Sequence, residues 1–234
     1  MITFLRQIPG RRPLRALQRV ETRRARIAVF LLFALVVLLR QPALLLKPRF
    51  FCEEGMIYYA YALHHPMLDA LLRTAAGYYS LVQNVSAILA AYCVPVEWAP
   101  LVTTGVGAAI QLLPYAIILW SHASFWQRDY AKFLGCLAVL TTAVSDEIWL
   151  TTLGVHFHLS LVTSLLLLEE GTSGRGWRGT AHVWLLLMAG LTSPVSGFLT
   201  PLYFLKAWWE GNRASLVQAL VLAGATVVQL IVVI

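Results

Sequence analysis

The sequence has little charge for its length. Charged residues make up 12% of the 234 residues, about half of the share in an average soluble domain, whereas hydrophobic residues make up 59%. Repeats typical of soluble proteins, low-complexity tracts, phosphate-binding glycine loops and zinc-spaced cysteines are absent, and three cysteines are too few for a disulfide framework. A soluble globular domain is therefore nearly ruled out.

The formal net charge of +7 is concentrated at the N-terminus. Residues 1 to 26 hold eight arginines and one acidic residue, Glu21, while the rest of the chain holds ten basic and ten acidic side chains. A basic tail directly before an apolar run is typical of the cytoplasmic anchor of a membrane protein, so the charge is no evidence for a nucleic-acid partner. We expect a basic cytoplasmic tail over 1–26 and a transmembrane module over 27–234 that lies in the lipid bilayer.

Successive apolar stretches predict an all-α, polytopic helix bundle. The run 27–46 has about the twenty residues needed to cross a bilayer, and further runs cover about 97–120, 132–149, 150–168, 181–208 and 214–234. Residues 181–208 form either one kinked span or a hairpin that turns at 192–194. Each half of such a hairpin falls below the usual minimum of about 17 residues for a full crossing.

Lysine and arginine counts in the connections predict the orientation. With the N-terminus in the cytoplasm, fourteen basic residues lie inside, three (Lys47, Arg49 and Arg73) lie outside, and Arg40 lies near the outer end of its helix. The long connection 47–96 is then the first outer loop.

The first outer loop is apolar enough to lie along the membrane surface. Residues 54–65 and 77–93 predict two interfacial helices, and Cys52 and Cys93 in this loop could pair. The second helix is predicted to have one apolar face, made of Leu81, Val85, Ile88, Leu89 and Tyr92.

Two acidic pairs are candidates for chemistry. Glu53-Glu54 follows the first predicted span, Asp146-Glu147 lies between the third and fourth, and the predicted topology places both pairs on the outer face. Adjacent carboxylates can act as a general base or bind a divalent cation with other oxygen ligands. The structural alternatives are capping of the following helix for the first pair and ion pairing for the second. Three arginines are available for that ion pairing: Arg40, Arg49 and Arg73.

The outer side also holds cations and histidines. Guanidinium groups can hold a phosphate by bidentate hydrogen bonds. The cations on the outer side are Arg40, Lys47, Arg49 and Arg73, and at least two of them are expected to snorkel to lipid headgroups. His156 and His158 lie near the outer end of the fourth predicted span. Their i, i+2 spacing points them to different sides of a helix, so a shared metal is not expected, but one of them can contact a phosphate or an acceptor hydroxyl.

Five short stretches together carry a family resemblance. They are RFFCEEG at 49–55, GYY at 77–79, Trp149, HFH at 156–158 and LTSP at 191–194. With the basic tail, the single span and the long outer loop, they resemble the GT-C superfamily of membrane glycosyltransferases, over most of the chain. Two departures stand beside the resemblance: the 192–194 turn has no basic residue, and members are usually much longer, so we expect a fragment or a minimal module.

The resemblance implies a function. Members transfer a sugar from a polyprenyl-phosphate or polyprenyl-diphosphate donor to a lipid, glycan or protein acceptor on the non-cytoplasmic face. It implies an essential acidic residue in the first outer loop, matching Glu53-Glu54, and often another in the second, matching Asp146-Glu147. It also favours the hairpin at 192–194, and with it about seven spans.

The chemistry of sugar transfer suggests a role for each candidate residue. A phosphate leaving group needs cations rather than an acid, whereas the acceptor hydroxyl needs a base on the opposite face, which inverts the anomeric carbon. We expect Glu53 or Glu54 to be that base, and Arg49 and Arg73 to hold the donor phosphate. Members occur with and without a divalent cation such as Mg²⁺ or Mn²⁺; since no histidine is a clear ligand, we favour metal-independent transfer.

Other functions fit the composition too. A transporter or flippase could line a pathway with the same charges, but no internal hydropathy repeat is visible. A non-catalytic membrane subunit is the other alternative. Arg-rich, Lys-poor usage favours a high-GC genome, hence a bacterial inner membrane.

Overall fold

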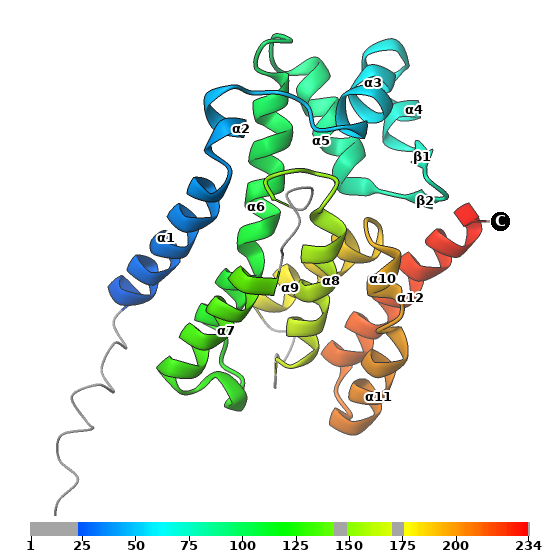
Figure 1. The fold of residues 1–234 in the computed structure, drawn as a ribbon. Helices are drawn as coiled ribbons and strands as arrows, with labels where there is room; N and C mark the ends of the chain where they lie inside the picture. Colours follow the sequence, from blue (N-terminus) through cyan, green and yellow to red (C-terminus); the bar gives the residue numbers. More distant parts are fainter. Residues whose placement is uncertain (1–22, 143–148, 170–175, 234) are drawn as a thin grey trace, which may run out of the picture.

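The computed structural model describes residues 23–142, 149–169 and 176–233 (Figure 1). These residues are helical almost throughout, and one short antiparallel hairpin pairs Thr74 with Tyr79 and Ala75 with Tyr78. The predicted all-α class is therefore confirmed. Asp146 and Glu147, the second acidic pair, lie outside the described residues.

The longer helices form a bundle. Its core joins α1, α6 and α7 through Phe33, Tyr115 and Cys136, and a second core joins α8, α9, α11 and α12 around Leu186 and Tyr203. The bundle consists of α1 (Arg23–Arg40), α6 (Ala99–Trp120), α7 (Asp129–Thr142), α8 (Val155–Leu167), α9 (Trp177–Gly190), α11 (Thr200–Glu210) and α12 (Arg213–Val233), with the short η3 (Ser124–Trp126) before α7 and α10 (Pro194–Gly197) before α11.

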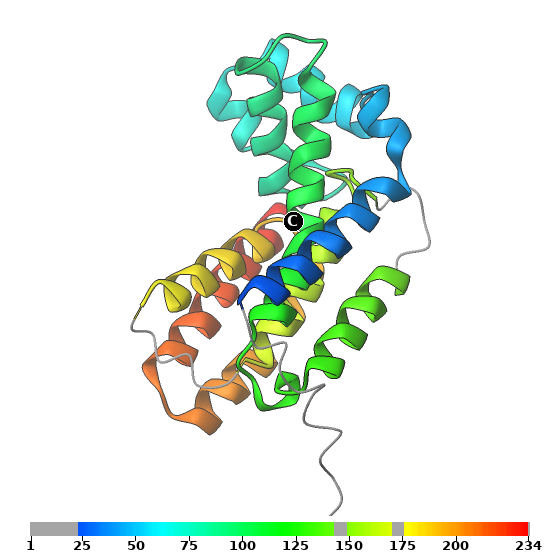
Figure 2. The same cartoon turned by 90° about the vertical axis from the view of Figure 1, so that its left-hand side faces the viewer.

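The segment 42–92 forms a separate layer, called the head below. Figures 1 and 2 show it at one end of the molecule, around the first turns of α6. It consists of α2 (Pro42–Leu46), the π-helix η2 (Glu54–Tyr59), α3 (Ala60–His64), α4 (Met67–Leu71), strands β1 (Thr74–Ala75) and β2 (Tyr78–Tyr79), and α5 (Leu81–Tyr92).

Few of the helices are long enough to cross a membrane. Among the described residues only α6 and α12 have the length and apolar character, and α9 with α10–α11, bent by 118° at the predicted 192–194 turn, would add a third. The prediction of about seven spans is therefore not supported. Four of the eighteen residues of α1 are arginines, and α7 and α8, with 14 and 13 residues, reach only about 20 Å.

Helix α5 buries polar side chains and exposes apolar ones, which is the reverse of a helix in a soluble protein. The predicted 54–65 helix is present as η2 and α3, but the second predicted helix begins at Leu81 because residues 74–79 form the hairpin. Gln83, Asn84 and Ser86 are buried, whereas Leu89 and Tyr92 on the predicted apolar face are 40% and 55% exposed. Large exposed apolar faces over a polar interior suit a helix with apolar surroundings.

Hydroxyl pairs connect the bundle helices. Ser160 Oγ lies 2.8 Å from Ser193 Oγ, and Thr200 Oγ1 lies 3.0 Å from Thr226 Oγ1. Tyr203 donates its hydroxyl to the Thr163 carbonyl at 2.7 Å. Such short interhelical hydrogen bonds between small polar residues are typical of helix packing in lipid, where packing and hydrogen bonding replace the hydrophobic effect.

Basic side chains gather at the end opposite the head. Lys132 Nζ donates to the carbonyls of Leu119 and Ser121 at 3.2 Å, so it caps the C-terminus of α6. Partial burial and the nearby cations Arg178, Lys132 and Arg26 lower the pKa of His122. The starts of α1 and α9 and the α6–α7 connection therefore share one end, called the basic end below.

The connection 149–154 passes very close to α6. Gln111 accepts a hydrogen bond from the Leu150 backbone N–H at 3.1 Å, and Leu150 has a positive φ of 56°. A Cβ at Gly107 would lie 2.8 Å from the Thr151 carbonyl carbon and oxygen. Only glycine allows this approach.

We predict opposite effects for two alanine substitutions in α6. Gly107→Ala forces the 149–154 backbone away and should destabilise the protein by about 1–3 kcal/mol. Gly105→Ala meets open space and should stabilise the helix by up to about 1 kcal/mol. Thermal unfolding in detergent measures both; equal shifts of Tm would contradict the close approach.

Candidate functional site

The structure separates the two glutamates of the first acidic pair. Glu54 is 3% exposed, and its carboxylate accepts three hydrogen bonds. Oε1 accepts from the Thr152 backbone N–H at 2.5 Å and from the Thr152 hydroxyl at 2.6 Å, and Oε2 accepts from the Phe51 N–H at 3.0 Å. Because its oxygens are occupied in this way, Glu54 joins the head to the 149–154 connection.

A tight turn leads into this glutamate. Cys52 has a positive φ of 42°, and the Glu54 N–H donates back to the Phe51 carbonyl at 3.0 Å. The π-helix η2 starts directly after the turn, and π-helical turns occur frequently at functional sites. The turn leaves Glu53 exposed while its neighbour is buried.

Glu53 lies near a pair of tyrosines. Burial raises the pKa of Tyr58, and the Tyr78 and Glu53 side chains add to the rise, whereas Arg73 opposes it. Burial and the Glu53 charge likewise raise the pKa of Tyr78. Glu53 therefore acts on both phenols and Arg73 acts on Tyr58. Both phenols stay neutral near pH 7 and can donate hydrogen bonds. These four residues are called the tyrosine cluster below.

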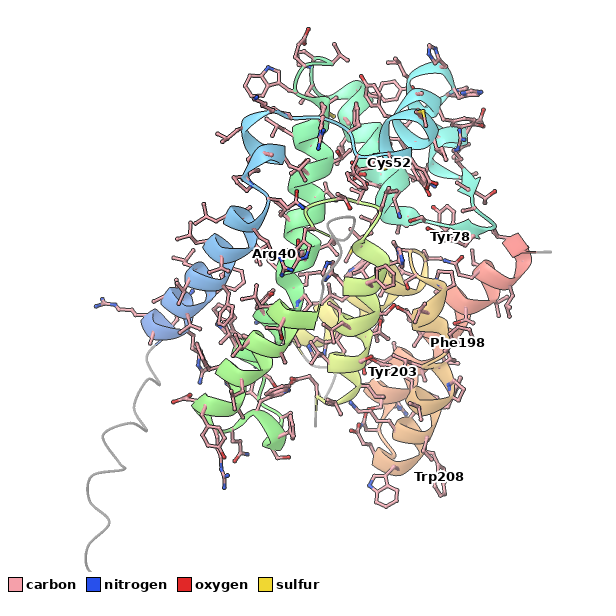
Figure 3. All side chains as sticks on the ribbon, in the orientation of Figure 1. Arg40, Cys52, Tyr78, Phe198, Tyr203 and Trp208 are labelled. Atoms are coloured by element: carbon pink, nitrogen blue, oxygen red, sulfur yellow. The ribbon has the colours of Figure 1, made fainter. Side chains whose placement is uncertain are left out.

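Several contacts hold the tyrosine cluster in place. Gln229 of α12 pairs with both backbone groups of Tyr79, at 3.0 Å to its N–H and 2.9 Å to its carbonyl, and so fixes strand β2. Asn84 of α5 donates to the Arg73 carbonyl at 2.8 Å. Figure 3 shows Cys52, which precedes Glu53, and Tyr78 between the head and the bundle.

Arg73 is held by an aromatic stack. Its guanidinium carbon lies 3.8 Å from the centre of the Tyr61 ring, which stacks on His65 at 3.7 Å and 6°. Within the described residues, the buried Arg73 Nε has no hydrogen-bond partner. Stacking orients the planar group while leaving N–H donors for an anion, so this predicted phosphate ligand does not snorkel freely.

The other predicted site residues are more scattered. Arg49 is exposed on the connection between α2 and η2. At the start of α8, His158 is 7% exposed, whereas His156 is half-buried with its ring 4.0 Å from that of Phe157. Their different burial agrees with the predicted i, i+2 geometry.

Arg40 and two cysteines are also candidate pairing residues. Arg40 stacks over Trp149 at 4.0 Å and donates to the Leu140 carbonyl at 3.0 Å (Figure 3). The acidic pair Asp146-Glu147, for which Arg40 is an alternative partner, lies outside the described residues. Cys52 and Cys93 are both exposed free thiols, so the disulfide that they could have formed is not present. Within the described ranges, no three His, Cys, Asp or Glu side chains gather as a metal site would require.

Sequence reasoning missed several residues that position the site. Thr152, Asn84 and Gln229 make contacts that no motif in the sequence predicts, and these contacts cross up to 150 positions of the chain. The available indication was a polar amide within an apolar run, as for Gln229 in α12.

Comparisons with known proteins identified no relative of this chain. No family model matches the chain, and neither a curated protein nor a solved structure is significantly similar to it. The function therefore has to be argued from the residues themselves.

We predict that the two glutamates differ in their effect on stability. In Glu54→Gln the side-chain NH₂ must face at least one of three N–H or O–H donors, which should cost about 1–3 kcal/mol. Glu53→Gln changes an exposed side chain and should stay within about 0.5 kcal/mol. Chemical unfolding in detergent measures both, and a larger loss for Glu53→Gln would contradict the division.

Proposed function

We propose that this protein is a membrane glycosyltransferase that uses a polyprenyl-phosphate or polyprenyl-diphosphate sugar donor. One observation carries the proposal: an exposed carboxylate, Glu53, acts on two neutral tyrosines, Tyr58 and Tyr78, and a cation held by aromatic stacking, Arg73, acts on the first of them. A base for the acceptor and a positively charged holder for the phosphate are the two groups that transfer from a phosphate leaving group requires.

Glu53 is the better candidate for the general base. A base needs a free oxygen within hydrogen-bond reach of the acceptor hydroxyl. Glu54 already accepts three hydrogen bonds inside the protein, whereas Glu53 is the exposed carboxylate of the tyrosine cluster. We therefore assign proton removal to Glu53 and a positioning role to Glu54.

Arg73 is the better candidate for the donor phosphate. Its guanidinium is fixed against Tyr61, and the hydroxyls of Tyr58 and Tyr78 can supply further donors to phosphate oxygens. Arg49, exposed on the connection before the same turn, is the second candidate. Because these protein groups can stabilise the leaving phosphate, the proposed reaction uses no metal ion.

We propose a bacterial inner membrane as the location, with the basic end in the cytoplasm and the head on the outer face. The grouping of Arg26, Lys132 and Arg178 at one end supports this orientation, because basic residues resist translocation. The apolar helices α6 and α12 and the outward apolar face of α5 support contact with lipid. The tyrosine cluster then faces the side where polyprenyl-linked sugars are used.

The reaction follows from this geometry. The acceptor hydroxyl loses its proton to Glu53 and attacks the anomeric carbon, the bond from that carbon to the phosphate oxygen breaks, and polyprenyl phosphate or diphosphate leaves against Arg73. Attack opposite the leaving group inverts the anomeric configuration.

We predict that Glu53→Gln lowers the rate of sugar transfer by about 10²- to 10⁴-fold, the usual contribution of a general base. The assay incubates the purified protein with short-chain polyprenyl-phosphate sugars and measures released polyprenyl phosphate. Glu97→Gln removes another exposed carboxylate, on the connection from α5 to α6, and should keep full activity. Near-normal turnover in Glu53→Gln would sink the base assignment, and movement of the lipid across the membrane without release would favour a flippase.

We predict a second effect for Arg73. Arg73→Lys keeps the charge but loses the planar stack on Tyr61, so the KM for the donor should rise by about tenfold. Arg49→Lys, which changes an exposed side chain in the same way, is the matched control. If Arg49→Lys raises the donor KM and Arg73→Lys does not, the phosphate binds at Arg49 and the assignment to Arg73 is wrong.

A further inference from the structure

Figure 1 shows α7 at the end of the molecule opposite the head. A groove runs beside this helix. Its volume is about 730 Å³, and its walls come from η3, from the turn that follows it and from one face of α7. Its main lining residues are Phe125, Trp126, Arg128, Tyr130, Leu134 and Ala138. None of them belongs to the tyrosine cluster.

Small residues of α7 create the groove. A Cβ at Gly135 would lie 2.6 Å from the Trp126 ring, so this glycine lets the indole pack directly against the helix. Trp126 is only 7% exposed and forms the floor. Ala131, Leu134 and Ala138 follow at helical spacing along the same face, which leaves a shallow apolar channel.

The groove is polar at one end and apolar along the rest. Arg128 donates to the Tyr130 hydroxyl at 2.6 Å, and both side chains are exposed at the mouth beside Gln127. Leu134, 55% exposed, and Ala138 lie further along the helix. A cationic mouth above an apolar channel is complementary to an amphiphile with an anionic head and a hydrocarbon chain.

The position of the mouth agrees with this chemistry. The mouth follows the end of α6 at Trp120. Among the described residues, α6 is one of the helices long and apolar enough to cross a membrane. Exposed Phe125 and Tyr130 add aromatic side chains of the kind that lie at headgroup level. Arg26, Asp129 and Glu169 all act on the nearby Lys132, so with Arg128 three cations stand against two carboxylates in this region.

We propose that this groove binds one anionic phospholipid. Its phosphate lies against Arg128 and the Tyr130 hydroxyl, and one acyl chain lies over Leu134 and Ala138. The site is separate from the proposed transferase site, and it holds a structural or regulatory lipid at the basic end whether or not the protein transfers sugars.

Native mass spectrometry of the full chain in detergent tests the proposal. Phosphatidylglycerol, phosphatidylcholine and glycerol 3-phosphate are offered in turn as probes. Phosphatidylglycerol should bind at least fivefold more tightly than phosphatidylcholine, the factor expected from about one basic side chain at an anionic headgroup. Equal binding of the two lipids, or full competition by glycerol 3-phosphate, would overturn the proposal.

Three variants locate the binding. Arg128→Gln should remove the preference for phosphatidylglycerol, and Ala138→Trp, which fills the channel, should weaken both lipids. Arg178→Gln removes an exposed cation of the same end outside the groove and should change nothing. If Ala138→Trp does not fold, Ala138→Leu fills less of the channel. An Arg178→Gln effect as large as that of Arg128→Gln would show general charge attraction instead.

Discussion

One buried carboxylate, that of Glu54, holds the head in its place on the bundle. Its three hydrogen bonds join the turn at Phe51 to Thr152, 98 positions further along the chain. A carboxylate removed from water is costly unless hydrogen bonds replace its hydration, so this contact tolerates little movement. The left-handed turn at Cys52 and the close passage of the 149–154 connection over Gly107 belong to the same arrangement.

The buried glutamate determines what its neighbour can do. Since Glu54 enters the interior, the turn keeps Glu53 at the surface, beside Tyr58 and Tyr78. Arg73, on the segment between α4 and β1, acts on Tyr58 and is oriented by Tyr61. Glu53 and Arg73 therefore both belong to the head, while Arg26, Lys132 and Arg178 gather at the opposite end. The basic end supports the proposed membrane orientation, and the presence of a carboxylate and a guanidinium on the head supports the proposed transfer.

The sequence predicted the features that depend on local composition. Helical class, the helix after Glu54 and the bend at 192–194 follow from periodicity and proline. The number of spans was wrong because apolar runs were counted without the shortness of α7 and α8. The division between Glu53 and Glu54 could not be predicted, since it depends on Thr152, a partner that no local pattern indicates.

In the proposed reaction, Glu53 removes a proton from the acceptor while a phosphate leaves the opposite face of the sugar. The anomeric configuration of the product that the purified wild-type protein forms from a polyprenyl-phosphate sugar, determined by nuclear magnetic resonance, tests this reaction. We expect release of polyprenyl phosphate with inversion at the anomeric carbon. Release with retention, or a donor that stays intact with every class of acceptor, would contradict it.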